Sequence, residues 1–199
     1  MVTQKALKTK ERILVAATQC FFKYGYHATG LEQIIKTAEV TKGNFYYYFK
    51  SKEILALETL DWQFEKITND IKEQVLNKKT KPLATLFALF DLMTNRQKQQ
   101  HKEGQICGCY FGNFALELSP KSSQVSAKIK QIFSQYAQLI SDLIQQAIDA
   151  KEISNKINAD KMGSIILGQL EGAILLDKTN QQPSQVDHSI DFIKQYLQQ

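Results

Sequence analysis

Apolar side chains recur three and four residues apart along nearly the whole chain, and this spacing is the strongest constraint on its fold. Between residues 8 and 24, one such stripe contains Ile13, Ala17, Cys20 and Tyr24. Only 9 glycines and 3 prolines occur in the 199 residues, too few for the many tight turns of an all-β protein. The pattern predicts an all-α fold.

Capping residues and chain breakers divide this pattern into further helices. "TGLE", residues 29–32, has the form of a capping box, with Thr29 capping and Glu32 reaching back. Thr41 and Ser51 are the expected caps of the next two helices. Another predicted helix begins at Pro82, and the polar loop "QKQQHKEGQ" follows it. Four further helices are predicted at 106–118, 123–150, 158–177 and 185–197.

The segment "KGNFYYYF", residues 42–49, fits either a strand or a helix on local propensity. As a helix it places Phe45 and Phe49 four residues apart, both facing inward. As a strand it leaves Tyr46 and Tyr48 unburied, and no second strand pattern lies nearby to pair with it. The sequence therefore predicts a short helix.

The net charge of +5 is distributed unevenly. Residues 1–52 hold nine Lys or Arg side chains against three acids, whereas the other 147 residues are close to neutral. A small basic module favours a nucleic-acid partner. No uninterrupted run of 18 apolar residues is present, so no membrane-spanning helix is expected. The first twenty residues are too charged for a signal peptide, and three cysteines are too few for a disulfide framework. These features predict a cytoplasmic protein.

Two short helices joined by a tight turn inside a basic three-helix unit predict a helix-turn-helix, whose second helix enters the major groove of DNA. Gly43 permits close approach of the backbone, Lys42 can reach guanine or phosphate, and Tyr46 and Tyr47 offer hydroxyls and flat rings. The helix amino termini at Thr29, Thr41 and Ser51 suit phosphate binding, and Lys52 can hold the DNA backbone.

The stretch "TKERILVAATQCFFKYGYHATGLEQIIKTAEVTKGNFYYYFKSKE" closely resembles the DNA-binding domain of the TetR/AcrR family of bacterial transcriptional regulators. The resemblance implies an all-α homodimer with a DNA-binding domain at 1–52 and a regulatory and dimerisation domain at 53–199. Tyr48 is expected to be mostly structural. The DNA contacts that the resemblance implies are Thr29, Thr41, Lys42, Gly43, Asn44, Tyr46, Tyr47, Tyr48 and Lys52.

"ICGCYFGNFALELSP", residues 106–120, resembles a "G-C-x-x-G-N-x-A-x-E" stretch in a subset of TetR-like repressors, some of which sense electrophiles or oxidants through a cysteine. Cys109 occupies that position. A modified Cys109 thiolate is one alternative. The other is that Cys107 and Cys109 are packing residues lining a hydrophobic pocket. "GQLEGAILLD" lacks a basic residue that would lower the thiol pKa, and its acids would raise it. The candidate ligand or sensor residues are Cys109, Cys107, Tyr110, Phe111 and Asn113.

The last two long helices are expected to form a dimer as a four-helix bundle, because one apolar stripe runs along each. The alternative is that these stripes complete the core of the monomer. The predicted dimer residues are Ile166, Leu170, Ala173, Ile190, Ile193 and Leu197.

The sequence as a whole predicts a dimeric repressor that is released from a near-palindromic operator by a small-molecule inducer, or by modification of Cys109. It predicts no catalysis and no cofactor, and the three scattered histidines form no metal-site spacing. Two remote alternatives are a helical enzyme with Cys109 as nucleophile, which lacks an evident base, and a protein–protein adaptor, which leaves the basic amino-terminal unit unexplained.

Overall fold

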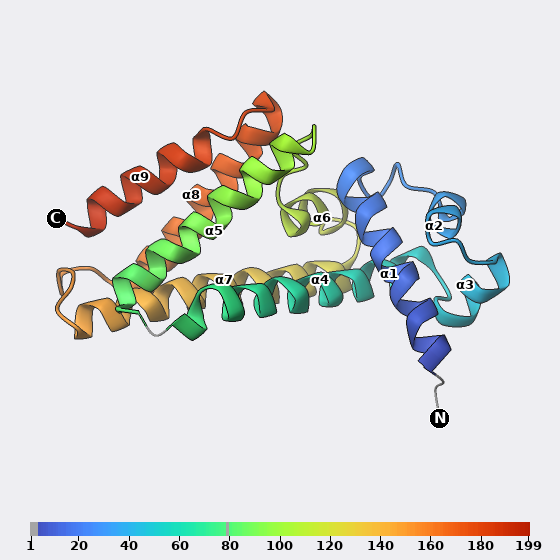
Figure 1. Cartoon of the computed structure of the whole chain (residues 1–199), viewed down its shortest axis with the longest axis horizontal. Coiled ribbons are helices and arrows are strands. Elements are labelled where there is room, and N and C mark those ends of the chain that lie inside the picture. Colours follow the sequence, from blue (N-terminus) through green and yellow to red (C-terminus); the bar gives the residue numbers. More distant parts are fainter. Residues whose placement is uncertain (1–3, 79) are drawn as a thin grey trace. The chain divides into compact units, whose positions relative to one another are not determined.

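The computed structural model describes residues 4–78 and 80–199, and all regular structure within these residues is helical. The helices are labelled in Figure 1. They are α1 (Gln4–Tyr24), α2 (Leu31–Thr37), α3 (Lys42–Tyr48), α4 (Lys52–Gln74), the 3₁₀ turn η1 (Leu76–Lys78), α5 (Pro82–Lys102), α6 (Tyr110–Leu118), α7 (Ser123–Asp149), α8 (Ala159–Asn180) and α9 (Gln185–Leu197). The predicted all-α fold class is confirmed.

The helices divide into two compact units. The first unit contains the described residues up to Ile67 together with Asn113–Ile129. Its core includes the fully buried rings of Phe21, Phe45 and Phe49, and Phe114 of α6 packs edge-on against Phe21 with 5.6 Å between ring centroids. The carboxy-terminal end of α6 is thus part of the same core as α1.

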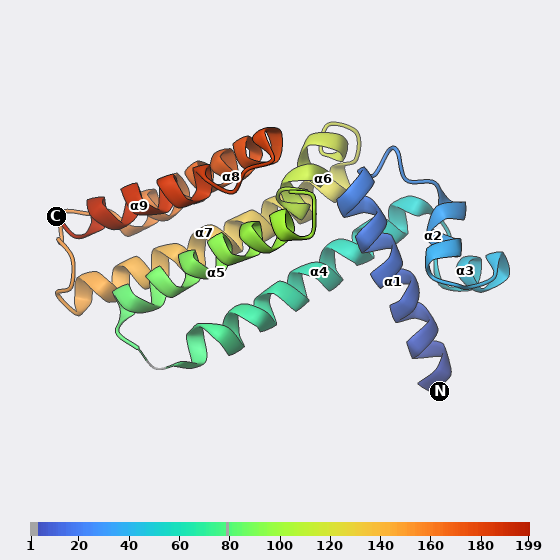
Figure 2. The ribbon, with the colours of Figure 1, turned by 45° about the horizontal axis from the view of Figure 1, so that its top comes forward.

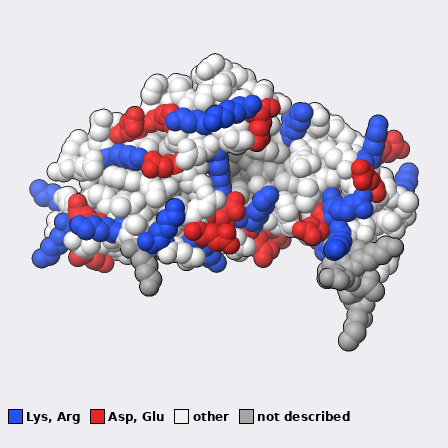
Figure 3. All heavy atoms as spheres, viewed as in Figure 1, with Lys and Arg blue, Asp and Glu red and all other residues white. Residues whose placement is uncertain are grey.

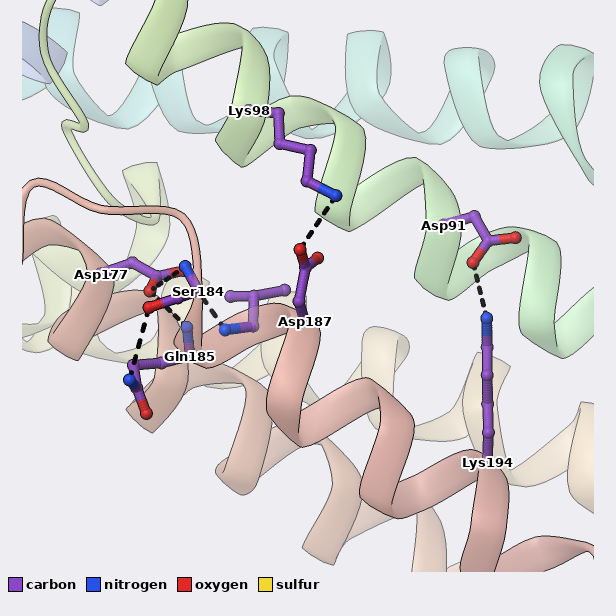
Figure 4. A network of polar contacts seen from close by, with 8 residues as sticks. Asp91, Lys98, Asp177, Ser184, Gln185, Asp187 and Lys194 are labelled. Atoms are coloured by element: carbon purple, nitrogen blue, oxygen red, sulfur yellow. Dashed lines mark hydrogen bonds and ion pairs between the residues drawn. The ribbon is translucent and has the colours of Figure 1, made fainter.

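The second unit contains Thr68–Gly112 and Lys130–Gln199. Helices α8 and α9 run side by side in both ribbon views (Figures 1 and 2), and α5 also packs against α9. Figure 4 shows how polar contacts hold α9 in place. Lys98 and Asp187 form one ion pair of 2.9 Å between α5 and α9, and Lys194 and Asp91 form another of 2.7 Å.

The buried carboxylate of Asp177, near the end of α8, closes the turn into α9 (Figure 4). It accepts hydrogen bonds from the backbone N–H groups of Ser184, Gln185 and Val186, at 3.0, 2.7 and 3.3 Å. These are the donors left without a helical partner at a helix start, and a negative charge there is also favoured by the helix dipole. Asp177 therefore acts as the cap of α9.

Three predicted helix boundaries differ from the structure. The capping box at the start of α2 is wrong, because the cap residue is Gly30 and no side chain caps the helix. Helix α5 continues to Lys102 and so includes residues 97–102 of the segment 97–105 that was predicted as a polar loop. Helix α6 begins only at Tyr110, because Gly108 adopts a positive φ of 88° that interrupts a helix.

The polar segment is helical because tertiary contacts use its polar side chains. The amide oxygen of Gln100 accepts hydrogen bonds from the backbone N–H groups of Cys107 and Gly108, at 2.7 and 3.2 Å. The side-chain amide of Gln181 accepts a hydrogen bond from the backbone N–H of Ile106 at 2.9 Å and donates one to its carbonyl oxygen at 3.0 Å. The segment before α6 is therefore held by the side chains of two glutamines, Gln100 of α5 and Gln181, which follows α8. None of the helices in the described ranges has the length and apolarity needed to cross a bilayer.

Candidate DNA-binding site and regulatory region

Helix α3 is anchored by two phenylalanines and capped by a threonine. Phe45 and Phe49 are fully buried, as the four-residue spacing predicted. The Thr41 hydroxyl accepts a hydrogen bond from the backbone N–H of Asn44 at 3.2 Å. Ser51 caps α4 in the same way, with Ile54 N–H donating at 3.1 Å. The predicted short helix is confirmed over Lys42–Tyr48, and Phe49 follows it as the C-cap with an extended backbone.

The opposite face of α3 is exposed. Tyr47 is 73% exposed and Tyr46 is 40% exposed, unusually high values for aromatic side chains, and Lys42 and Asn44 are also exposed. Tyr48 is half-buried, and its ring packs edge-on against that of Tyr47 with 4.9 Å between centroids. Five of the residues predicted to contact DNA thus lie on one short surface: Thr41, Lys42, Asn44, Tyr46 and Tyr47.

Gly43 has no packing partner inside the chain that requires a glycine. A Cβ atom there would meet only the Thr41 hydroxyl, at an ordinary contact distance of 3.9 Å. The interior of the protein therefore does not explain the missing side chain. A glycine on the exposed face of a short helix leaves the backbone open to close approach from outside, as the DNA-binding prediction requires.

The structure turns one predicted DNA contact inward. Thr29 is fully buried, and its hydroxyl donates to the carbonyl oxygens of Gly25 and Cys20, at 2.7 and 3.2 Å. Its side chain stabilises the turn between α1 and α2 and does not reach the surface, so Thr29 leaves the set of DNA-contacting side chains.

Lys52 is half-buried and packs on an aromatic ring. Its ammonium group lies 4.3 Å from the ring centroid of Tyr26. Burial lowers the pKa of Lys52, and the negative charge of Glu117 opposes this effect. A DNA contact of Lys52 stays a prediction.

Arg12 is a functional residue that the sequence reasoning missed. Its guanidinium donates from α1 to the carbonyl oxygens of Ala38 and Glu39, at 2.7 and 2.9 Å, and so holds the turn between α2 and α3. Glu39 adopts a positive φ of 51° in this turn. No local pattern pairs residues 26 positions apart, so only the tertiary structure reveals the contact.

The surface charge is less segregated than the sequence suggested. On the face drawn in Figure 3, basic and acidic side chains are interspersed. Ion pairs account for part of this pattern, including Lys10 with Glu58 at 2.6 Å and Lys128 with Asp61 at 2.7 Å. The basic residues available for a polyanion are therefore fewer than the net charge of the first 52 residues implies.

Cys109 lies beside a carboxyl group in the second unit. Its thiol hydrogen-bonds to Glu171 of α8, and its sulfur also accepts from the backbone N–H of Gly112 at 3.4 Å. Burial of the thiol, and then the negative charge of Glu171, raise the pKa of Cys109 well above its usual value. The sequence expectation that an acid of this helix would raise the pKa is confirmed.

The neighbouring groups are also shifted toward their neutral forms. Burial raises the pKa of Glu171, and the hydrogen bond from Cys109 opposes that shift. Burial also raises the pKa of Tyr136, and the nearby Cys109 adds to this. The cluster of Cys109, Glu171 and Tyr136 thus favours a protonated thiol, the opposite of an activated cysteine.

The other candidate ligand residues fall into different environments. Tyr110 and Phe111 are buried, and the Phe111 ring packs against Tyr136 with 5.9 Å between centroids. Cys107 is half-buried in the segment before α6. Asn113 is half-buried and belongs to the first compact unit, whereas the other four belong to the second.

Two family comparisons cover most of the chain. Residues 13–59 match the family of bacterial regulatory proteins called the tetR family, and residues 82–193 match the tetracyclin repressor-like C-terminal domain. The chain belongs to the TetR family of regulatory proteins. It is therefore a DNA-binding transcriptional regulator, and its first match includes the whole of α2 and α3.

Individual relatives agree over nearly their full lengths. The transcriptional regulator LmrA of Bacillus subtilis is 32% identical, with 80% of this chain and 85% of LmrA covered. The transcriptional repressor DhaR of a Mycobacterium species is 26% identical, with 94% and 91% covered. A TetR regulator from Chloroflexus aurantiacus has the same fold, with a TM-score of 0.87 at 24% identity and 99% and 98% covered.

TetR-family regulators act as dimers, and the structure corrects which residues of this chain could form the contact. The six predicted dimer residues are at most 4% exposed and pack inside the chain's own core. Their prediction as a dimer surface is wrong, because the regular stripes of α8 and α9 are needed to pack these two helices on each other and on the rest of the unit. The corrected residues are Ile166, Leu170, Ala173, Ile190, Ile193 and Leu197.

The other faces of the same two helices expose large apolar side chains. Ile165 is 60% exposed and Phe192 is 61% exposed, and Leu175, Leu176 and Tyr196 are also exposed. Gly168 and Gly172 lie on the same side of α8, and a Cβ at either would meet nothing within 4 Å. We call Ile165, Leu175, Leu176, Phe192 and Tyr196 the outer apolar face. Exposed apolar side chains on two neighbouring helices make this face a candidate interaction surface.

Proposed function

We propose that this TetR-family regulator is a homodimeric repressor that binds a near-palindromic operator through α3 and is released by a small molecule. The observation that carries the proposal is the two-sided construction of α3. Phe45 and Phe49 hold the helix in the core, while Lys42, Tyr46 and Tyr47 project from it. A helix of this kind in a helix-turn-helix reads base edges from its exposed amino-terminal half.

Dimerisation supplies the specificity that one short helix lacks. A single seven-residue helix contacts few base pairs, whereas two copies related by a two-fold axis read both halves of a palindromic site. We assign the contact to the outer apolar face, because its large apolar side chains are exposed on α8 and α9 and the family match extends over α8 and the first part of α9.

The inducer acts through noncovalent binding in the second unit in this proposal. The raised pKa of Cys109 argues against the alternative switch, in which an electrophile modifies a thiolate. At neutral pH the thiol carries its proton, and the adjacent Glu171 would repel a developing negative charge on sulfur. The relative DhaR, which is named a transcriptional repressor, supports the sign of regulation.

Substitution of the exposed face of α3 tests the DNA-binding assignment. We expect Tyr47→Ala and Lys42→Ala each to weaken operator binding by about 1–3 kcal/mol. The fold should remain intact, because both side chains are exposed. The measurement is a fluorescence-anisotropy titration with an operator selected from random duplexes by the wild-type protein.

Lys130→Ala is the matched control, because it removes one exposed positive charge outside the helix-turn-helix. Lys42→Ala should also reduce the salt dependence of operator binding if the ammonium group contacts a phosphate. Operator affinities equal to that of Lys130→Ala in both α3 variants would contradict the proposal.

A further inference from the structure

The carboxylate of Glu117, in the last turn of α6, binds the turn between α1 and α2 within the first unit. One of its oxygens accepts a hydrogen bond from the backbone N–H of Tyr26 at 3.1 Å, and the other accepts from that of His27 at 2.9 Å. Hydrogen bonds to a charged acceptor are about twice as strong as neutral ones. The proposed DNA-binding role of α3 makes no use of this contact.

The α1–α2 turn is shaped to receive this carboxylate. Gly25 ends α1 with a positive φ of 85°, and a Cβ atom there would lie 2.8 Å from a carboxylate oxygen of Glu117. The buried hydroxyl of Thr29 donates to the Gly25 carbonyl and fixes the other side of the turn. Gly25 therefore serves both the backbone conformation and the close approach of Glu117.

Other groups extend the contact to the start of α4. The Lys52 ammonium lies over the Tyr26 ring. Burial lowers the pKa of Lys52, and the negative charge of the nearby Glu117 opposes this effect. The His27 ring lies 3.3 Å from the Glu117 carbonyl oxygen and 3.5 Å from the Lys121 ammonium. The Ser122 hydroxyl donates to Glu53 at 2.6 Å. Elements on both sides of α2 and α3 are thus tied to the end of α6.

The other end of α6 belongs to the second unit. Residues 110–112 begin the helix there, and a Cβ on Gly112 would lie 2.9 Å from the Glu171 carboxylate and 3.3 Å from Cys109. The helix is continuous over its 9 residues, a length of about 13 Å at the usual rise per residue. Residues of both units thus lie on one continuous helix.

We infer that Glu117 is a positioning residue for operator binding. Its two hydrogen bonds hold the helix-turn-helix in a fixed register, that is, a fixed orientation on the end of α6. In a dimer this register sets the separation of the two α3 helices, and loss of the bonds lets each helix-turn-helix take its own orientation. The inference rests on the proposed function, because it concerns binding to two half-sites at once.

The variant Glu117→Gln tests the inference, because it keeps the size of the side chain but replaces one acceptor oxygen with a donor amide. We expect affinity for the two-half-site operator to fall about tenfold or more. Affinity for a duplex carrying one half-site should stay within about twofold, because each helix-turn-helix remains intact. Both duplexes come from the operator selected by the wild-type protein.

Glu65→Gln is the control for charge, because Glu65 is an exposed acid of the same unit. Losing one negative charge by itself strengthens binding to DNA, so the control and Glu117→Gln should change operator affinity in opposite directions. Thermal melting by circular dichroism monitors folding of each variant.

The inference is overturned if Glu117→Gln and Glu65→Gln bind the operator with equal affinity. It is also overturned if Glu117→Gln loses affinity equally for the operator and for the half-site, because a parallel loss indicates damage inside the helix-turn-helix. A wild-type protein that binds the operator no better than the half-site would instead overturn the proposed function, and the inference with it.

Discussion

Cys109 shows how a single residue changes meaning with its neighbour. The sequence left this cysteine either as a sensor or as a packing residue. In the structure its thiol hydrogen-bonds to Glu171, and burial and this carboxylate both raise its pKa. Because a thiol reacts through its thiolate, a raised pKa means slow reaction at neutral pH. The local chemistry favours the packing alternative.

This reading predicts the effect of removing the acid. Glu171→Gln should lower the pKa of Cys109, enlarge its thiolate fraction near pH 8 and speed its alkylation by iodoacetamide, measured by peptide mass spectrometry. Glu73→Gln, an exposed acid of the same unit, serves as control. Equal alkylation rates of Cys109 in the wild-type protein and Glu171→Gln would count against the influence of the carboxylate.

The raised pKa of Glu171 also predicts how the stability of the protein depends on pH. A folded-state pKa above the unfolded value means that the folded protein holds this proton more tightly, so stability falls as pH rises from the unfolded pKa through the folded one. Glu171→Gln abolishes this loss. The free energy of unfolding of the variant relative to wild type should therefore increase in urea titrations as the pH rises above the ordinary carboxyl value of 4.5. A difference that is flat across this range would refute the assignment.

Helix α3 illustrates what decides an element of only seven residues. So short a helix is unstable alone, and its aromatic residues favour a strand by intrinsic propensity. The burial of Phe45 and Phe49 and the cap at Thr41 decide for the helix. These features were readable in the sequence because their spacing is local.

Removal of the α3 cap should therefore be measurable. We expect Thr41→Ala to lower the free energy of unfolding by about 1 kcal/mol, because the Asn44 N–H loses its acceptor. Thr41→Ser keeps the hydroxyl and should retain most of the stability. Chemical denaturation gives both values, and equal losses in the two variants would show that the methyl group matters more than the cap.

At the scale of the whole molecule, the placement of apolar residues on α8 and α9 determines how two chains can associate. The buried stripe of each helix completes the chain's own core, and the outer apolar face stays exposed, as the proposed dimer contact requires. An isologous contact places the same face against itself, so one substitution is introduced twice in every dimer.

We expect Phe192→Asp to shift the protein toward monomers, since it brings two charges into the contact. Sedimentation equilibrium measures the shift. Leu116→Asp is the matched control, because Leu116 is 71% exposed on α6 and belongs to the first unit. An unchanged dimer in Phe192→Asp would move the contact elsewhere on the surface.

The sequence alone determined the all-α fold, the helix-turn-helix and the orientation of α3, because helical periodicity, caps and inward-facing phenylalanines are local relations between residues three or four apart. It also indicated the family through the residues of that unit. Only the tertiary structure decided that Thr29 points inward, that the regular stripes of α8 and α9 are core, and that Arg12 and Glu117 hold distant turns. These outcomes depend on contacts between residues from 9 to about 90 positions apart. A helix with two apolar faces does not itself specify which of them packs inside the chain's own core.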